Sequence, residues 1–117
     1  MDAVAITVGC SWIVAGLLTC GLSLPLVRGR VARNPLYGVR FPQSFASEDA
    51  WYAINRYGGR QLCLWSLPMI AVGVVSLFLP LQTHVGLTLL LGFAPLLFLM
   101  IALVRSWRFA RQYDSAG

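Results

Sequence analysis

The sequence contains no lysine and few charged residues of any kind. Charged side chains make up 11% of its 117 residues, and only four residues are acidic, whereas a soluble domain carries about a quarter charged residues. Hydrophobic residues make up 58% of the chain. This composition excludes an ordinary soluble domain and indicates one small membrane domain over residues 1–117.

Residues that bind metals or form disulfide frameworks are also scarce. Cys10, Cys20 and Cys63 have no CxxC spacing, and His84 has no second ligand spaced to share a metal with it. Neither a disulfide framework nor a metal site is indicated, and we expect no cofactor. We expect the three cysteines to be small buried hydrophobic residues and His84 to be a polar residue at a membrane interface.

Three apolar runs, at about 3–27, 62–80 and 85–104, contain no Asp, Glu, Lys or Arg. Each is close to the length of about 20 residues that a helix needs to cross the hydrocarbon core. The first run lacks a basic start and exceeds the apolar part of a secretory signal, so we interpret it as a retained helix. The absence of charge inside the runs argues against a proton-coupled transporter.

All nine basic residues are arginine, and the formal net charge is +5. Six arginines lie between the first and second runs and three follow the third: Arg28, Arg30, Arg33, Arg40, Arg56, Arg60, Arg105, Arg108 and Arg111. Because positive charge in short loops stays in the cytoplasm, we expect the amino terminus outside and the carboxyl terminus inside. Arginines beside apolar runs favour anionic lipid headgroups over nucleic acid as the partner.

Small residues and prolines mark the predicted spans. Four small residues of the first helix recur every four positions: Ser11, Ala15, Thr19 and Ser23. They predict close helix packing, either within the chain or between the two chains of a homodimer. Pro68 and Pro95 lie inside the second and third helices, where we expect them to bend the helix or to open a small polar pocket.

Residues 28–61 predict a cytoplasmic loop followed by a short amphipathic helix. Asn34-Pro35 favours a turn and Phe41-Pro42 favours extended backbone, so together they predict a compact loop. Ser47 can cap a helix of about ten residues, and Gly58-Gly59 can end it. Its apolar face consists of Ala50, Trp51, Ile54 and Tyr57. Such a helix can rest in the inner headgroup layer; alternatively, its arginine and aromatic side chains clamp a ligand, with Glu48 reaching toward Arg56.

The stretch NPLYGVRFPQSFASEDAWYAINRYGGR, residues 34–60, resembles the signature segment of the SdpI family of bacterial membrane proteins. The matching residues are Asn34, Tyr37, Gly38, Arg40, Ser44, Trp51, Asn55, Gly58 and Gly59. The resemblance implies a multi-pass protein of the bacterial plasma (inner) membrane that protects the cell against a membrane-active peptide toxin. The ligand-binding or partner-binding residues that we infer from the motif and its surroundings are Asn34, Tyr37, Gly38, Arg40, Ser44, Glu48, Trp51, Asn55, Arg56 and Gly59.

Other functions stay open at this point. A membrane scaffold would use the arginine-rich inner face to recruit a cytoplasmic regulator such as a repressor. A lipid-phosphate enzyme would hold phosphate with Arg40, Arg56 and Arg60 and use Glu48 or Asp49 as general base, but no catalytic constellation is recognised. A small drug transporter is a further alternative. We therefore expect a non-enzymatic, all-α membrane protein whose partners include lipids, a peptide toxin, a regulator or a second copy of the chain.

Overall fold

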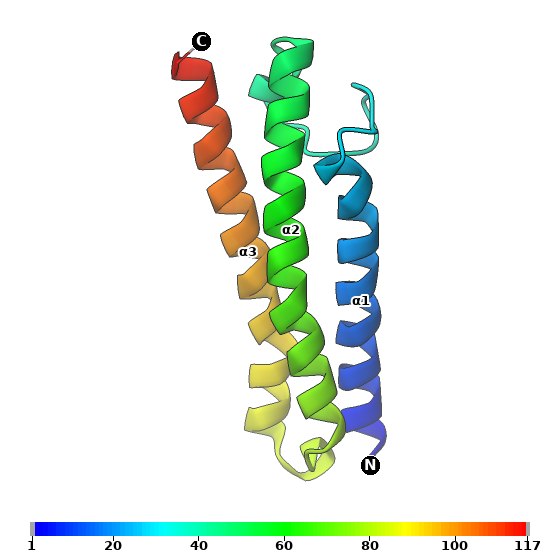
Figure 1. Cartoon of the computed structure of the whole chain (residues 1–117). Helices are drawn as coiled ribbons and strands as arrows, with labels where there is room; N and C mark the ends of the chain where they lie inside the picture. Colours follow the sequence, from blue (N-terminus) through cyan, green and yellow to red (C-terminus); the bar gives the residue numbers. More distant parts are fainter. Residues whose placement is uncertain (1, 117) are drawn as a thin grey trace.

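The computed structural model describes residues 2–116, with the side chains of residues 2–113, and contains three long helices. The helices are α1 (Ala3–Val27), α2 (Glu48–Leu77) and α3 (Val85–Ala116), and two short 3₁₀ helices, η1 (Pro42–Phe45) and η2 (Leu81–Thr83), lie in the connections. The central helix α2 runs antiparallel to α1 and α3 (Figure 1). The α1–α2 loop and the C-terminal part of α3 therefore share one end of the molecule. We call this end, residues 28–61 and 105–113, the arginine-rich end.

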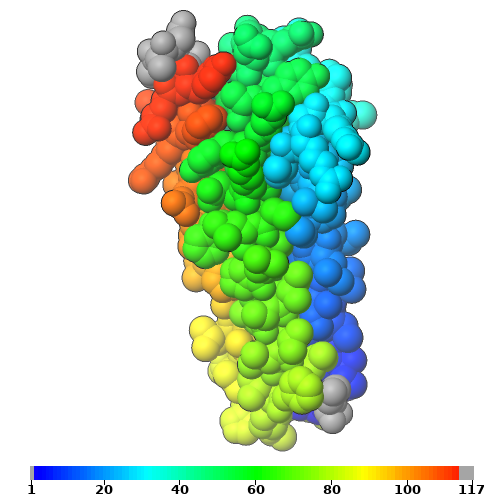
Figure 2. Space-filling view, in the orientation of Figure 1, coloured from blue at the N-terminus to red at the C-terminus, as the bar shows by residue number. Residues whose placement is uncertain are grey.

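The all-α class and the three spans are confirmed. All three helices are long and apolar enough to cross a membrane, and the molecule is 53 Å long. Many large apolar side chains are exposed on the outer faces, among them Val14, Leu17, Leu18, Leu22, Leu89, Leu90, Phe93, Leu97 and Met100. Figure 2 shows that the chain forms one continuous elongated body with α2 flanked by its neighbours. Lipid covers such apolar surface in a bilayer, so the exposure fits a membrane protein.

The predicted short amphipathic helix does not exist as a separate element. The helix α2 is continuous for 30 residues from Glu48 to Leu77, so the predicted stop at Gly58-Gly59 is wrong. Both glycines are buried, and a Cβ atom would lie 2.5 Å from Val39 Cγ2 at Gly58 and 3.0 Å from the Ser23 carbonyl oxygen at Gly59. Neighbouring chain segments approach so closely here that a side chain does not fit. This close packing, and not the end of a helix, explains why both positions are glycine.

The helices α1 and α2 meet through small residues spaced seven apart on each helix. From one end of the interface to the other, Gly9 faces Gly73, Gly16 faces Ser66, and Ser23 faces Gly59. A seven-residue spacing keeps all three positions on the same face of each helix, and the missing side chains let the two backbones come close. The packing stripe overlaps the predicted one only in part: Ser23 belongs to both, whereas Ser11 is exposed.

The prolines lie inside continuous helices as expected, whereas the cysteines depart from expectation. The helices α2 and α3 continue across Pro68 and Pro95, and their bending stays a prediction. Cys10 is exposed, whereas Cys20 and Cys63 are half-buried with their Sγ atoms 2.8 Å apart. The expectation that all three cysteines are buried was wrong, because Cys10 lies on the outer face of α1 and the other two are only partly covered. The antiparallel register of α1 and α2 places Cys20 and Cys63 opposite each other.

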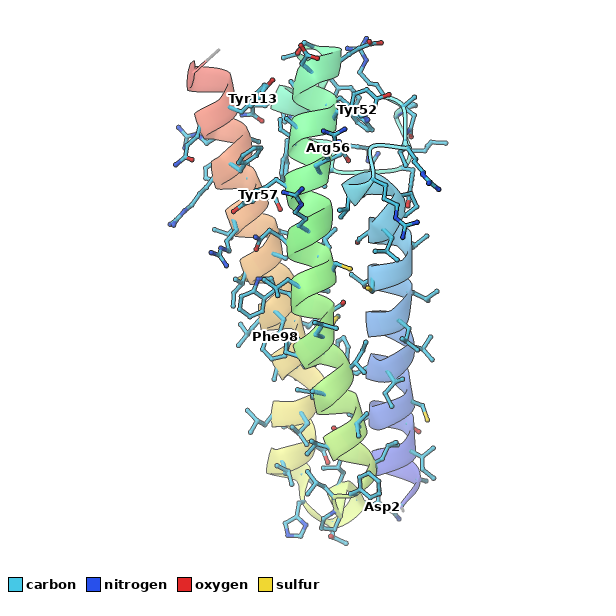
Figure 3. The ribbon with its side chains drawn as sticks, viewed as in Figure 1. Asp2, Tyr52, Arg56, Tyr57, Phe98 and Tyr113 are labelled. Carbon is cyan, nitrogen blue, oxygen red and sulfur yellow. The ribbon has the colours of Figure 1, made fainter. Side chains whose placement is uncertain are left out.

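At the end opposite the arginine-rich end, the carboxylate of Asp2 links the start of α1 to the α2–α3 turn. Asp2 Oδ1 accepts a hydrogen bond from the Ala5 amide (2.6 Å), and Oδ2 accepts one from the Gln82 amide (3.0 Å). Figure 3 shows Asp2 beside the α2–α3 turn. The Gln82 and Ala5 amides lower the pKa of the Asp2 carboxyl from its usual 3.8, because hydrogen bonds to the charged form favour it. His84 is exposed at this same end.

Candidate functional site at the arginine-rich end

The loop after α1 is shaped by the side chain of Asn34. Its Oδ1 accepts hydrogen bonds from the amides of Leu36 (2.9 Å) and Tyr37 (2.6 Å). Its Nδ2 donates to the carbonyl oxygens of Ala32 (2.9 Å) and Tyr37 (3.0 Å). The Tyr37 hydroxyl in turn donates to the Leu22 carbonyl of α1. Asn34 therefore builds the turn, as asparagine often does, and Tyr37 fastens it to α1.

Asn55 fastens the same loop to α2. It is buried, its Oδ1 accepts from the Val39 amide (2.6 Å), and its Nδ2 donates to the carbonyl oxygens of Trp51 (2.9 Å) and Val39 (3.3 Å). The preceding residue, Gly38, has φ +121°, and a Cβ atom there would lie 2.7 Å from Asn55 Oδ1. Only glycine suits both this conformation and this contact. The buried amide is thus fully used in holding loop and helix together.

The apolar face of the first turns of α2 is covered by protein. Trp51 and Ile54 are both 0% exposed. The Trp51 Nε1 donates to the Val31 carbonyl (2.9 Å), and Ile54 packs in a small core with Val39 and Ala110. The prediction that this face rests in the lipid headgroup layer is therefore wrong, because the folded loop and α3 cover the face and leave no room for lipid.

The charged residues of the predicted site lie on the surface. Glu48 is exposed in the first turn of α2, which Ser47 caps. Arg56 is exposed too, and its guanidinium covers Gly29, where a Cβ atom would lie 2.8 Å from Arg56 Nη2. Figure 3 shows Tyr52 and Arg56 on the upper part of α2. Within residues 2–113, no ion pair joins Glu48 to Arg56, so the predicted charge contact does not form.

An open cavity of about 590 Å³ lies beside the loop. Its lining combines the loop, η1 and one leucine from each of α2 and α3: Pro35, Gly38, Val39, Arg40, Phe41, Phe45, Leu62 and Leu103. Arg40 is exposed, and its Nη1 donates to the Pro35 carbonyl (2.6 Å). Arg33 Nη1 lies 3.4 Å from the Phe45 carbonyl oxygen. Apolar walls and an arginine at the edge can hold an apolar group that carries a negative charge.

Two polar side chains of η1 lack hydrogen-bond partners. Ser44 is 0% exposed, and neither its Oγ nor Gln43 Oε1, also buried, has a partner. Both residues lie between Phe41 and Phe45, which line the cavity. Most buried polar atoms in proteins are hydrogen-bonded. The wall segment of the cavity therefore has unused hydrogen-bonding capacity.

The motif thus divides into structural residues and residues available for binding. Six of the ten predicted site residues hold the fold together: Asn34, Tyr37, Gly38, Trp51, Asn55 and Gly59. Of the other four, Arg40 lines the cavity, Ser44 lies in its wall segment, and Glu48 and Arg56 lie elsewhere on the surface. Of the eight residues that line the cavity, the predicted site contained only Gly38 and Arg40. Sequence reasoning missed the apolar walls, and nothing distinguishes Leu62 and Leu103 from other leucines of an apolar span.

The sequence comparisons identify a family that covers most of the chain. The SdpI/YfhL protein family model matches residues 30–103, which contain most of the α1–α2 loop, η1, α2, η2 and the first part of α3. No curated protein and no solved structure matches the chain. The family match covers more than half of the 117 residues. The chain is therefore a multi-pass membrane protein that belongs to the SdpI/YfhL protein family.

Proposed function

We propose that this protein protects a bacterial cell against a membrane-active peptide, and that it acts from its arginine-rich end. Membership of the SdpI/YfhL family supports an immunity-type function. The observation that carries the proposal is the cavity edged by Arg40, because the family motif surrounds a built site that an apolar, charged molecule can enter. The hydrogen bonds of Asn34 and Asn55 keep the wall of this site in place.

We further propose that the arginine-rich end faces the cytoplasm of a bacterial plasma membrane. All nine arginines are exposed, and they lie on the α1–α2 loop, the first turns of α2 and the last part of α3, which share one end (Figure 1). The other end, with Asp2 and η2, contributes no arginine. The rule that positive loops stay inside supports this orientation.

We assign the protein a binding role and no catalytic one. An enzyme acting on lipid phosphates would need its arginines to converge on one phosphate. Arg40 instead lies against Pro35 at the cavity, and Arg56 covers Gly29 on the α1 side of α2. A scaffold that recruits a cytoplasmic regulator is a second candidate, because the exposed arginines present a cationic surface that an acidic partner would bind.

Expression in a peptide-sensitive bacterium tests the proposed function. Cells that make the protein should tolerate a higher concentration of a membrane-active peptide than cells with an empty vector. Equal tolerance, with the protein shown to be in the membrane, would contradict the proposal. A reporter fused to the carboxyl terminus tests the orientation separately, and activity outside the cytoplasm would overturn it. Co-purification of a cytoplasmic protein, lost when the loop arginines become glutamine, would favour the scaffold.

A further inference from the structure

The cavity at the arginine-rich end lies where the apolar spans begin. Leu62 follows Arg60 by two residues on α2, and Leu103 precedes Arg105 by two residues on α3. On each helix, the leucine is thus one of the first apolar residues on the membrane side of the arginine. In a bilayer this position is the boundary between the headgroups and the hydrocarbon, so a membrane molecule can reach the cavity from the side.

The walls of the cavity suit an apolar chain. Val39, Phe41 and Phe45 come from the loop and η1, and Leu62 and Leu103 close the other side. The volume of about 590 Å³ lies within the range of roughly 300 to 1,000 Å³ that is usual for small-molecule sites. None of the lining residues is acidic, so nothing in the lining repels an anion.

The polar edge of the cavity suits a phosphate. A guanidinium has five N–H donors in a planar fork that fits phosphate oxygens. Arg40 uses one hydrogen bond for the Pro35 carbonyl, which orients the side chain and leaves its other donors available. Arg33 brings a second guanidinium to the same wall through the Phe45 carbonyl.

We propose that the cavity binds one anionic glycerophospholipid of the inner leaflet. Its phosphate is held by Arg40 with Arg33 nearby, and part of one acyl chain lies between two phenylalanines on one side and two leucines on the other: Phe41, Phe45, Leu62 and Leu103. A phospholipid has its phosphate and its acyl chains at adjacent depths of the bilayer. The arginine edge and the apolar walls of the cavity are arranged in the same order. The inference deepens the proposed function by naming a ligand for its site, and it rests on the proposed orientation of that end.

Lipid titration of the purified, delipidated protein tests the inference. Native mass spectrometry would count bound phosphatidylglycerol and phosphatidylcholine on the wild type and on three variants. Arg40→Gln should weaken the first phosphatidylglycerol by about tenfold, as expected for a lost charge-assisted contact. Arg105→Gln is the matched control: this exposed arginine lies outside the cavity, in the lining of a separate apolar pocket on α3, so its loss should have little effect on the first phosphatidylglycerol. Leu103→Trp should weaken binding by filling the cavity without changing charge.

Four results would overturn the inference. Equal loss in Arg40→Gln and Arg105→Gln would mean that lipid binds the surface charge generally. Equal affinity for phosphatidylcholine and phosphatidylglycerol would remove the role of the net negative charge. Complete displacement of phosphatidylglycerol by inorganic phosphate would assign the cavity to a free phosphate. Complete displacement by a membrane-active peptide would assign it to the peptide. The immunity function is measured by tolerance of living cells, so either proposal can fail while the other stands.

Discussion

Gly9 of α1 and Gly73 of α2 touch backbone to backbone. A Cβ atom built on Gly9 would lie 2.7 Å from the Gly73 carbonyl oxygen, and one built on Gly73 would lie 2.8 Å from the Gly9 carbonyl oxygen. The contact is reciprocal, so neither helix can carry a side chain at this point without moving apart from the other. Because the same kind of contact recurs at Gly16 and Gly59, it determines the distance between α1 and α2 along the bundle.

A bulky residue at this contact should separate the helices. Gly9→Leu is expected to lower the free energy of unfolding by about 1 to 3 kcal/mol, the usual cost of overpacking. Thermal unfolding in detergent measures the effect. Gly21→Leu is the control in the same helix, because a Cβ atom at Gly21 meets nothing within 4 Å. Equal midpoints for the two variants would contradict the close packing.

Removal of the Asn55 amide should release the loop from α2. Asn55→Leu leaves the buried Val39 amide without its acceptor, which costs about 1 to 3 kcal/mol for such a group. We expect trypsin to cut faster at Arg33 and Arg40 while the protein stays in the membrane. Gln112→Leu, at an exposed position of α3, should leave the cleavage rate unchanged. An unchanged rate in Asn55→Leu would show that the loop is held by other contacts.

The contact between Cys20 and Cys63 predicts a specific cross-link. Their Sγ atoms are 2.8 Å apart, so mild oxidation with copper phenanthroline should join them as a disulfide, each thiol losing a proton to the solvent and an electron to the oxidant. Cys10, which is exposed, should stay available for alkylation. Peptide mass spectrometry distinguishes the outcomes. A main product linked through Cys10 would contradict the register of α1 against α2.

Asp2 predicts a pH dependence at the opposite end of the bundle. Its pKa is lowered in the folded protein, so its contribution to stability is fully present above the ordinary value of 3.8 and is lost as pH falls through the lowered value. The unfolding midpoint of the wild type should exceed that of Asp2→Asn at pH 6, and the difference should shrink toward pH 3. The variant keeps a residue that can cap the helix. A difference independent of pH would contradict this account.

The helices and the motif could be predicted from the sequence, but the contacts that hold the loop and the helices together could not. Three uncharged apolar runs are enough to predict the spans, since lipid imposes a minimum length on them. The predicted end of a helix at Gly58-Gly59 failed because a glycine pair is also suited to close packing, and the packing partners, Val39 and Ser23, are far away in the sequence.

The site could be predicted only in part for the same reason. The motif drew attention to Asn55 and Trp51, yet their hydrogen bonds to Val39 and Val31 depend on how the loop folds. Both residues are buried supports of the loop. A substitution such as Trp51→Ala would therefore disturb the fold before it tested any binding, which leaves Arg40 as the informative position.

Tolerance of cells that carry Arg40→Gln tests the central claim most directly. The claim is that protection is exerted from the cavity that Arg40 edges. In a peptide-sensitive bacterium, at equal amounts of membrane-inserted protein, Arg40→Gln should lose most of the protection that the wild type gives, and Arg105→Gln should keep it. Full protection by Arg40→Gln, or equal loss in both variants, would contradict the claim.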